Sequence, residues 1–272
     1  MRIAASIDNQ FRITTLYTSF SYSYPPGYSF KGEAHNFYEI LIVMDGTIGV
    51  LAGNDIYTLT KGQMIIHDAM EFHRFWIEND SPPATTLIFT FSAENMPNYS
   101  SKLYSTQDLN YAMGILKEIN DSFEKEGISV LKIRDGREIH ANIAVKKLEL
   151  LILGTVAASI KTKKNKISHR AKHFGKIVEF LENNEHMALT VRDIAEAVHM
   201  SESNLQKIFM KYTGMGVISY FTYLKMTTAL TMVENGTPLK EISSSLGYEN
   251  QNYFSTVFKN FWGKSPSKFK PK

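Results

Sequence analysis

Two stretches decide the fold of this chain: Leu189-Thr-Val-Arg-Asp-Ile-Ala-Glu-Ala-Val-His-Met-Ser-Glu-Ser-Asn-Leu-Gln-Lys-Ile-Phe-Met-Lys-Tyr-Thr-Gly214 and Pro238-Leu-Lys-Glu-Ile-Ser-Ser-Ser-Leu-Gly-Tyr-Glu-Asn-Gln-Asn-Tyr-Phe-Ser-Thr-Val-Phe-Lys-Asn-Phe-Trp-Gly263. In each, a short apolar helix, a turn and a second helix with an apolar stripe follow one another, which is the order of a helix-turn-helix unit. Two such units in tandem can place two recognition helices in successive turns of one DNA groove. The repeat therefore predicts an all-α DNA-binding domain.

The first copy shows which of its side chains face outward. Thr190 with Asp193 three residues later forms a capping-box pattern, and Ser201 is placed to cap the following helix. That helix has an apolar stripe at helical spacing, made of Leu205, Ile208, Phe209 and Tyr212. The remaining positions present polar and flexible side chains that suit a DNA groove: Ser203, Gln206, Lys207, Met210 and Lys211.

The second copy repeats this logic. Pro238 is expected at the first helical position, and Gly247 at the turn. The apolar stripe of its second helix consists of Phe254, Val257, Phe258 and Phe261. Facing outward are Gln251, Asn252, Ser255, Thr256 and Lys259. One continuous helix, from Ile218 to Glu234, is predicted between the copies. A generic helical bundle would use similar core patterns, but the duplicated cap, core and polar face favour DNA binding.

These motifs resemble the AraC/XylS family of transcription regulators over about residues 171–270. The resemblance rests on Ile-Ala-x-x-Val198, Ser-x-x-x-Leu-x-Lys-x-Phe209, Gly-Tyr248, Tyr-Phe-Ser-x-Val-Phe-Lys259 and Gly-Lys-Ser-Pro266. It implies that both recognition helices enter adjacent major grooves. It also implies base contacts from Ser203, Gln206, Lys207, Gln251, Asn252, Ser255 and Thr256. Three departures from the family pattern, Lys207, Lys225 and Thr256, stand where arginine is frequent, so the operator sequence cannot be inferred.

Charge is distributed unevenly along the 272 residues, although the total is only +3. Residues 1–160 carry 13 basic and 18 acidic side chains, residues 161–170 five basic and none acidic, and residues 171–272 12 basic and nine acidic. A basic rear part suits a polyanionic partner, although a solvated linker would carry the same charges. The absence of cysteine excludes disulfides, thiolate metal sites and cysteine nucleophiles.

The first third of the chain predicts a β-rich fold. Short β-branched and aromatic runs alternate with Gly, Asn and Asp, as in a sandwich or barrel. The runs are 37–44, 47–52, 56–59, 64–67 and 85–91. We expect helices from about Gln107 and from about Arg137 to Ile160, with a loop near 126–135 between them. The overall prediction is an α+β protein: a cupin-like β-barrel with helices in 1–160, a basic linker in 161–170 and the DNA-binding domain in 171–272.

The helix predicted at 137–160 has a broad apolar surface, which includes Ile143, Leu148, Leu150, Leu151 and Ile152. Packing on the barrel of the same chain would explain part of this surface. A second subunit would explain the rest, and the sequence therefore predicts a homodimer.

The segment His35-Asn-Phe-Tyr-Glu39, followed six residues later by Gly46, resembles the first cupin motif, with Glu33 at the place of its leading histidine. Gly62 and His73 resemble the second motif. Strand alternation would bring these side chains together inside the barrel. The predicted effector-binding residues are His35, Phe37, Glu39, His73 and Trp76. Two imidazoles and a carboxylate could also hold a metal, but one ligand is replaced and AraC-like sensors generally bind small molecules without metal, so we expect neither a metal nor another cofactor.

The leading hypothesis is a transcriptional activator with a small-molecule effector, for which a sugar is one candidate, that contacts promoter DNA and RNA polymerase. The alternatives are a metal-dependent cupin enzyme fused to a DNA-binding domain and a regulator without an effector. No apolar run is long enough to span a membrane, and the Met1–Asp8 segment lacks the apolar core of a signal peptide. We therefore expect a cytoplasmic protein that is not an enzyme.

Overall fold

The computed structural model describes residues 10–97, 102–106, 108–158 and 169–270, which form two compact units. Residues 161–168 of the predicted linker and the Met1–Asp8 segment lie outside the described residues. None of the described helices is long and apolar enough to cross a membrane.

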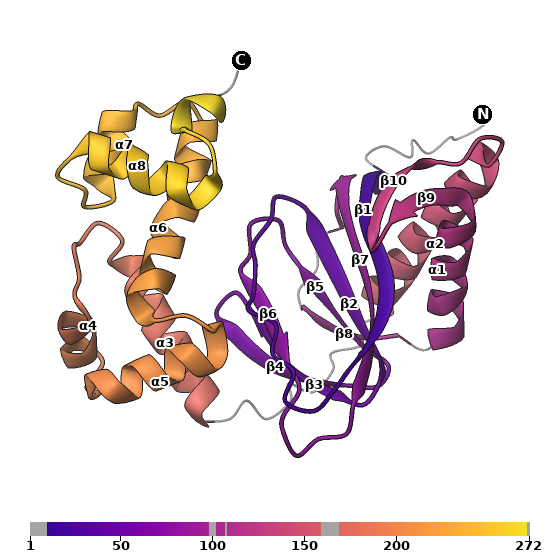
Figure 1. Ribbon diagram of the computed structural model, residues 1–272, viewed down its shortest axis with the longest axis horizontal. Helices are drawn as coiled ribbons and strands as arrows, with labels where there is room; N and C mark the ends of the chain where they lie inside the picture. The colour runs from indigo at the N-terminus through magenta and orange to yellow at the C-terminus, as the bar shows by residue number, and fades with distance from the viewer. Residues whose placement is uncertain (1–9, 98–101, 107, 159–168, 271–272) are drawn as a thin grey trace, which may run out of the picture. The chain divides into compact units, whose positions relative to one another are not determined.

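Figure 1 labels the elements of both units. The strands are β1 (Arg12–Tyr24), β2 (Tyr38–Asp45), β3 (Thr47–Ala52), β4 (Asp55–Thr60), β5 (Gln63–His67), β6 (His73–Trp76), β7 (Ala84–Glu94), β8 (Leu103–Ser105), β9 (Phe123–Glu126) and β10 (Ser129–Ile133). The helices are α1 (Leu109–Ser122), α2 (Glu138–Ala157), α3 (His169–Asn183), α4 (Val191–Ala197), α5 (Glu202–Thr213), α6 (Val217–Glu234), α7 (Leu239–Ser245), α8 (Gln251–Trp262) and the 3₁₀ turn η1 (Pro266–Lys268).

The N-terminal unit contains two sheets. One has the strand order β8-β5-β2-β7-β1-β10-β9 and the other β4-β3-β6. Strand β2 pairs antiparallel with both β5 and β7, and β3 pairs antiparallel with β6. The predicted α+β class is confirmed, whereas the described strands form two separate sheets, so closure into a barrel stays a prediction.

Strand β2 has two buried faces, and this places the side chains of the later site. Ile40 and Ile42 belong to a core cluster that also contains residues of α1 and α2. Leu41 and Val43 belong to a second cluster, which includes residues of the smaller sheet. Because successive side chains of a strand point to opposite faces, Glu39 lies on the same side as Leu41.

The turn after β2 depends on Gly46, as the Asp-Gly pair predicts. Its φ is +80°, and an added Cβ would lie within 3 Å of the backbone of Pro83 and Ala84. Only glycine takes this conformation without strain and also allows so close an approach. The turn therefore sets the start of β3.

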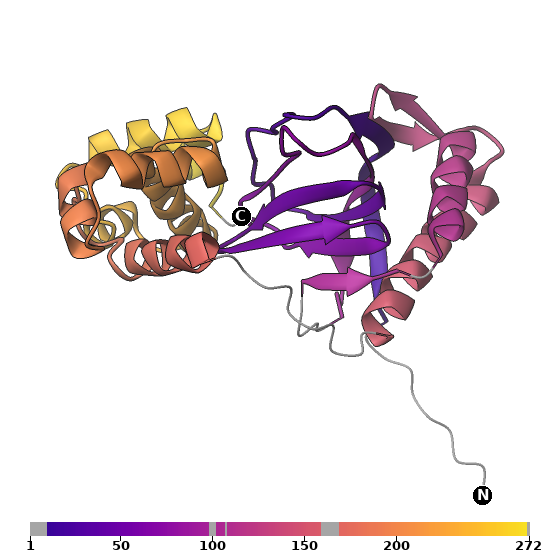
Figure 2. The same ribbon diagram turned by 90° about the horizontal axis from the view of Figure 1, so that it is seen from below.

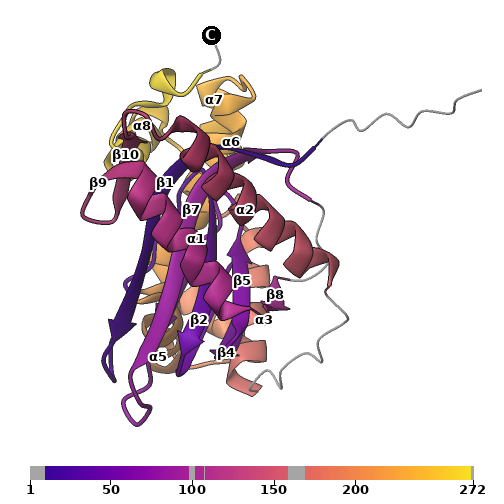
Figure 3. The same ribbon diagram turned by 90° about the vertical axis from the view of Figure 1, so that its right-hand side faces the viewer.

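Helices α1 and α2 lie side by side on one face of the larger sheet (Figures 2 and 3). On α2, the small side chains of Ala141 and Ala144 are buried, and so is that of Leu148. Leu151 and Ile152 are also buried, as predicted. Ile143 and Leu150 were predicted on the apolar stripe, but both are exposed, because α2 turns its alanine-lined face to the sheet.

Two parts of the larger sheet differ from the sequence-based expectation. The loop expected near 126–135 contains the hairpin β9–β10, which turns at Gly127 with a φ of +58°. Strand β1 was not predicted, although its Thr, Phe and Tyr residues favour strands, and it is held by its long pairing with β7. The β9–β10 hairpin is a local pairing, whereas β1 and β7 are far apart in the chain and their pairing is non-local.

The C-terminal unit is helical. Helix α6 packs against α5 in the first half of the unit and against α7 and α8 in the second half. In Figure 1, α6 runs from the α4–α5 pair to the α7–α8 pair. The predicted connecting helix is confirmed, and it starts one residue earlier than expected, at Val217.

Candidate nucleic-acid interface and effector site

The first helix-turn-helix unit is formed by α4 and α5, and local hydrogen bonds define both helix starts. The Thr190 hydroxyl accepts from the backbone N–H of Asp193, while the Asp193 carboxylate accepts from the backbone N–H of Thr190. The Ser201 hydroxyl accepts from the backbone N–H of Asn204. Both predicted caps are confirmed, and they satisfy backbone N–H groups that would otherwise be free at the helix starts.

Helix α5 buries Leu205, Phe209 and Tyr212 and presents a polar face. Four of its predicted DNA-contacting residues are exposed: Ser203, Lys207, Met210 and Lys211. Gln206 is only half-buried, and its Oε1 accepts from the backbone N–H of Val217 at 3.3 Å. This bond satisfies one of the free donors at the start of α6, so Gln206 connects the recognition helix to the connecting helix.

The second unit, α7 and α8, repeats the arrangement with two local differences. Pro238 is the N-cap of α7, one residue before the predicted position, because its ψ of 137° is extended. Asn250 caps α8, since its side-chain oxygen accepts from the backbone N–H groups of Asn252 and Tyr253. Gly247 makes the turn, as predicted, with a φ of +71°.

Helix α8 also carries its predicted polar set on the surface. Gln251, Asn252, Thr256 and Lys259 are exposed, and Ser255 is half-buried. The hydroxyls of Ser255 and Thr256 donate to the carbonyl oxygens of Gln251 and Asn252. Their hydroxyl oxygens are thereby oriented as acceptors, which favours contact with a donor such as a base amino group.

The buried face of α8 is narrower than predicted. Phe254 and Phe258 are buried, but Phe261, predicted to pack inward, is 39% exposed. It contacts the rings of Tyr223 and Trp262 instead of entering the core. The core of the second helix-turn-helix unit is therefore centred on the first two turns of α8.

Lys225 connects the two halves of the C-terminal unit. It is buried in α6, and its Nζ donates to the carbonyl oxygens of Met187 at 2.7 Å and Leu246 at 2.9 Å. The same ammonium lies over the rings of Phe221 and Tyr248. Burial lowers the pKa of Lys225, and the nearby Glu185 carboxylate partly opposes this. The sequence marked Lys225 as a departure from the family pattern but did not reveal these contacts.

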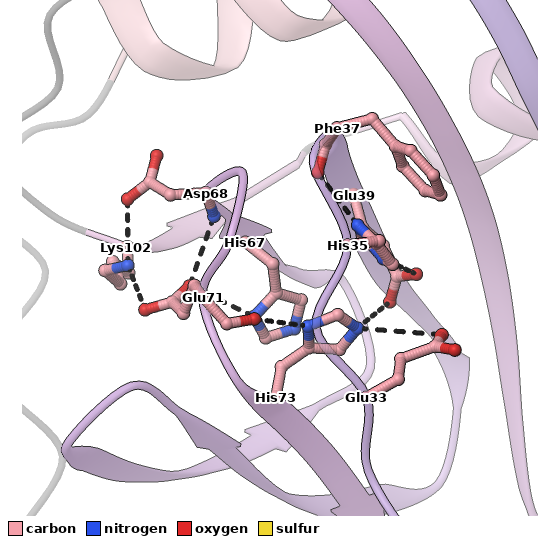
Figure 4. A network of polar contacts seen from close by, with 9 residues as sticks. All are labelled: Glu33, His35, Phe37, Glu39, His67, Asp68, Glu71, His73 and Lys102. Carbon is pink, nitrogen blue, oxygen red and sulfur yellow. Dashed lines mark hydrogen bonds and ion pairs between the residues drawn. The ribbon is translucent and has the colours of Figure 1, made fainter. Parts of the chain in front are cut away.

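The N-terminal unit contains a cluster of histidine and carboxylate side chains (Figure 4). Glu33, His35, Glu39 and His73 each offer one ligand atom, and these atoms lie within 4.8 Å of one another. Glu39 and His73 are buried, with exposures of 5% and 2%. The structure thus brings together three of the five residues predicted for the effector site, and Glu33 with them.

The electrostatics of this cluster are coupled. Burial by itself raises the pKa of Glu39, but the neighbouring His73 and His35 lower it, and the net shift is downward. For His73, burial lowers the pKa, while the Glu39 charge raises it to a net upward shift. For His67, burial and the charge of His73 lower the pKa. Glu39 and His73 therefore favour each other's charged forms.

The other two predicted effector residues lie differently. Phe37 stacks on His35 with ring centroids 3.8 Å apart, and so borders the cluster. Trp76 is buried against Gly49, where an added Cβ would lie 2.2 Å from the indole ring. Its Nε1 donates to Glu78 at 2.9 Å. Trp76 thus packs on β3 and is not among the clustered ligand atoms.

A second layer of polar side chains adjoins the cluster. His67 stacks on His73, with centroids 4.3 Å apart, and lies 3.5 Å from the Glu71 carboxylate. Lys102 binds both Glu71 and Asp68. Glu71 lies in a loop and Lys102 directly precedes β8, and only the tertiary fold brings them together.

Two family models match separate parts of the chain. An AraC-like ligand binding domain matches residues 17–119, and a helix-turn-helix domain matches residues 194–272. The first covers most of the strands, and the second covers both helix-turn-helix units from within α4.

Three curated relatives illustrate the similarity. The Msm operon regulatory protein of Streptococcus mutans is 40% identical over 84 residues, 30% of each chain. The lactose operon transcription activator of Staphylococcus xylosus is 31% identical over 94 residues, 34% of each chain. These matches span about a third of those two relatives. The HTH-type transcriptional activator RhaR of Pectobacterium carotovorum is 24% identical over 243 residues, 87% of this chain and 84% of that protein.

Proposed function

Since the chain belongs to the AraC/XylS family of transcriptional regulators, we propose that it binds promoter DNA through α5 and α8 and activates transcription in response to a small-molecule effector. One observation carries the DNA-binding part. Two capped helix-turn-helix units, both packed on α6, present exposed polar faces made of the side chains described above. Amides, hydroxyls and ammonium groups at helical spacing are the groups that read base edges and phosphates.

The proposal assigns different tasks to individual side chains. Gln251 and Asn252 stand at the exposed N-terminal end of α8, where amides can pair with adenine. Lys207, Lys211 and Lys259 would contact phosphates or guanine. Ser203, Gln206, Met210, Ser255 and Thr256 complete the proposed surface.

Binding measurements on the full chain test this assignment. Gln251→Ala should weaken binding to a promoter fragment by about tenfold, the loss of one good base contact, and should leave binding to random DNA nearly unchanged. Ser244→Ala is a matched control, because Ser244 is exposed in the same unit but lies on α7. Equal losses on promoter and random DNA in fluorescence-anisotropy titrations would contradict a base-reading role.

We place the effector in the N-terminal unit, around His35, Phe37, Glu39, His73 and Trp76. Support comes from the ligand-binding family model over this region and from buried polar groups between strands. Sugars are the first candidates to test, because one relative is named for the lactose operon. Thermal-shift screening of the full chain should show one sugar that raises the melting temperature in a concentration-dependent way.

We also propose a homodimer that uses α2. Ile139, Ile143 and Leu150 are exposed on this helix, and Leu150 reaches 61%. Exposed apolar side chains on one helix are typical of an interface between subunits. Leu150→Glu should shift the mass measured by analytical ultracentrifugation from dimer to monomer, whereas the exposed Asn142→Glu should not.

We also propose RNA polymerase as a partner, because two of the relatives are transcription activators. We propose no catalytic step for the chain, because all three relatives are regulators.

A further inference from the structure

The cluster of Glu33, His35, Glu39 and His73 contains buried nitrogen atoms that lack hydrogen-bond partners. Within the described residues, the Nε2 atoms of His35 and His73 have none. His73 is almost completely buried, so solvent does not satisfy its Nε2. A buried polar atom without a partner costs free energy, so such an atom in a native fold calls for an explanation, of which a bound ion is one.

The protonation of both rings follows from their other nitrogen. His35 Nδ1 lies 2.9 Å from the carbonyl oxygen of Phe37, and His73 Nδ1 lies 3.1 Å from that of Glu71. A carbonyl oxygen can only accept, so each Nδ1 carries the hydrogen. In the neutral ring Nε2 then holds a lone pair. A histidine that donates Nδ1–H to a carbonyl while its Nε2 points to a shared centre is the arrangement of a metal ligand.

The carboxylate oxygens face these nitrogens at distances that suit an ion between them. His35 Nε2 lies 3.8 Å from Glu39 Oε2. His73 Nε2 lies 3.6 Å from Glu39 Oε1 and 3.9 Å from Glu33 Oε1. These separations are too long for hydrogen bonds. Donors on a shared tetrahedral Zn²⁺, with bonds of about 2.1 Å, lie about 3.4 Å apart, so a small inward movement would complete the site.

The backbone holds these residues in place. Glu33 and His73 form an isolated antiparallel bridge, in which each backbone N–H donates to the other's carbonyl oxygen at 3.0 Å. The backbone N–H of Met70 donates to the His35 carbonyl oxygen at 2.7 Å. Glu39 lies in β2, between two neighbouring strands. The donors are therefore preorganised by main-chain pairing and not only by their side chains.

From these observations we propose that Glu33, His35, Glu39 and His73 bind one divalent transition-metal ion, with Zn²⁺ as the first ion to test. Two imidazole nitrogens and two carboxylates match the borderline character of such ions. An ion would offset the negative charge of the buried Glu39 and give the two Nε2 lone pairs an acceptor. This proposal differs from the metal-free expectation drawn from the sequence, because the structure shows the unpartnered nitrogens and places Glu33 beside His73.

Metal binding to the full chain, without DNA, tests the proposal. Protein dialysed against EDTA and then against buffer is titrated with Zn²⁺ by isothermal calorimetry, and bound metal is counted by mass spectrometry. We expect one tight site per chain. His73→Ala and Glu39→Gln should each weaken that site by more than about 100-fold, since loss of a ligand exceeds the effect of losing an outer partner. Glu33→Ala should weaken it less, because Glu33 is half-exposed.

Controls separate this site from nonspecific binding and from misfolding. His140→Ala removes an exposed histidine of α2 and should leave the tight site unchanged. Glu39→Gln keeps the side-chain volume, and its circular dichroism spectrum shows whether the fold persists. No saturable Zn²⁺ binding by the wild-type chain would overturn the proposal, as would equal affinity in the folded Glu39→Gln variant.

A role for the ion in regulation rests on the proposed function, whereas the metal site does not. Promoter binding is therefore measured in EDTA and again with one equivalent of Zn²⁺. Promoter recognition without any tight Zn²⁺ site would remove the inference and keep the regulator. A tight Zn²⁺ site in a chain that does not distinguish promoter from random DNA would support the metal site and contradict the regulator.

Discussion

His199 and Gly247 occupy the same left-handed position in the turns of the two helix-turn-helix units, with φ angles of +54° and +71°. Each is the second residue after its helix, α4 or α7. Histidine pays a steric cost there that glycine avoids. The two turns therefore have the same left-handed backbone conformation, but one is formed by histidine and the other by the more flexible glycine.

This relationship predicts opposite effects of substitution. Gly247→Ala should destabilise the C-terminal unit by about 1–3 kcal/mol, because the positive φ is strained and the new Cβ would lie 2.5 Å from the carbonyl oxygen of His186. Gly263→Ala is the matched control. Gly263 has a φ of +73° but no atom within 4 Å of an added Cβ, so its loss should be smaller. Equal losses in urea unfolding would mean that the approach to His186 is unimportant.

His199→Gly should be neutral or stabilising by up to about 1 kcal/mol, since relief of strain is offset by the greater freedom of glycine in the unfolded chain. The melting temperature of the variant, compared with that of His186→Gly at an exposed position outside a helix, measures the effect. A clear loss of stability at residue 199 alone would show that the imidazole makes a contact that outweighs the strain.

Lys225 should contribute strongly to the stability of the C-terminal unit. Lys225→Met leaves the carbonyl oxygens of Met187 and Leu246 without their charged donor, for a loss of about 3 kcal/mol. Lys225→Arg keeps a cationic donor and should lose less than half as much. The exposed Lys240→Met serves as control. Similar urea midpoints for Lys225→Met and Lys240→Met would contradict the role of these bonds.

The cap of α4 predicts a dependence on pH. Hydrogen bonds from the Thr190 hydroxyl and backbone N–H hold the pKa of Asp193 below its ordinary value of 3.8. A carboxyl with a lower pKa in the folded state stabilises that state above its unfolded pKa, and this contribution is lost as the pH falls through the folded pKa. The stability difference between wild type and Asp193→Asn should therefore be full at pH 6 and shrink below about pH 4. A difference that stays constant from pH 6 to pH 3 would exclude this mechanism.

Gln206 should affect both stability and DNA recognition. Gln206→Ala removes the bond to the backbone N–H of Val217 and should lower the unfolding free energy by about 1 kcal/mol, in addition to weakening promoter binding. Gln251→Ala should change only binding, because no intramolecular bond of the Gln251 side chain is found within the described residues. Parallel unfolding and anisotropy measurements on both variants separate the two effects, and an unchanged stability of Gln206→Ala would contradict the capping contact.

Part of this molecule could be predicted because it depends on residues close in the chain. The caps at Thr190 and Ser201, the turn at Gly247 and the Asp45-Gly46 turn involve neighbours within a few positions, where propensity and hydrogen-bonding geometry act directly. The spacing of the apolar residues in α5 likewise predicts which face of the helix is buried.

Other features arise only when distant segments meet. Strand β1 exists through pairing with β7, and α2 turns Leu150 outward because its alanines fit the sheet. Lys225 finds its carbonyl partners 38 and 21 residues away. Local sequence patterns cannot predict such contacts, because packing of the whole unit sets the geometry of the contacts.

The chain's own order of residues therefore determined the paired helix-turn-helix units and their polar faces, because helix periodicity and capping are local properties. Tertiary structure alone decided that Glu33 and His73, forty positions apart, share a backbone bridge and face Glu39. Burial in that setting removes water from the histidine nitrogens, and this arrangement is the basis of the proposed metal site.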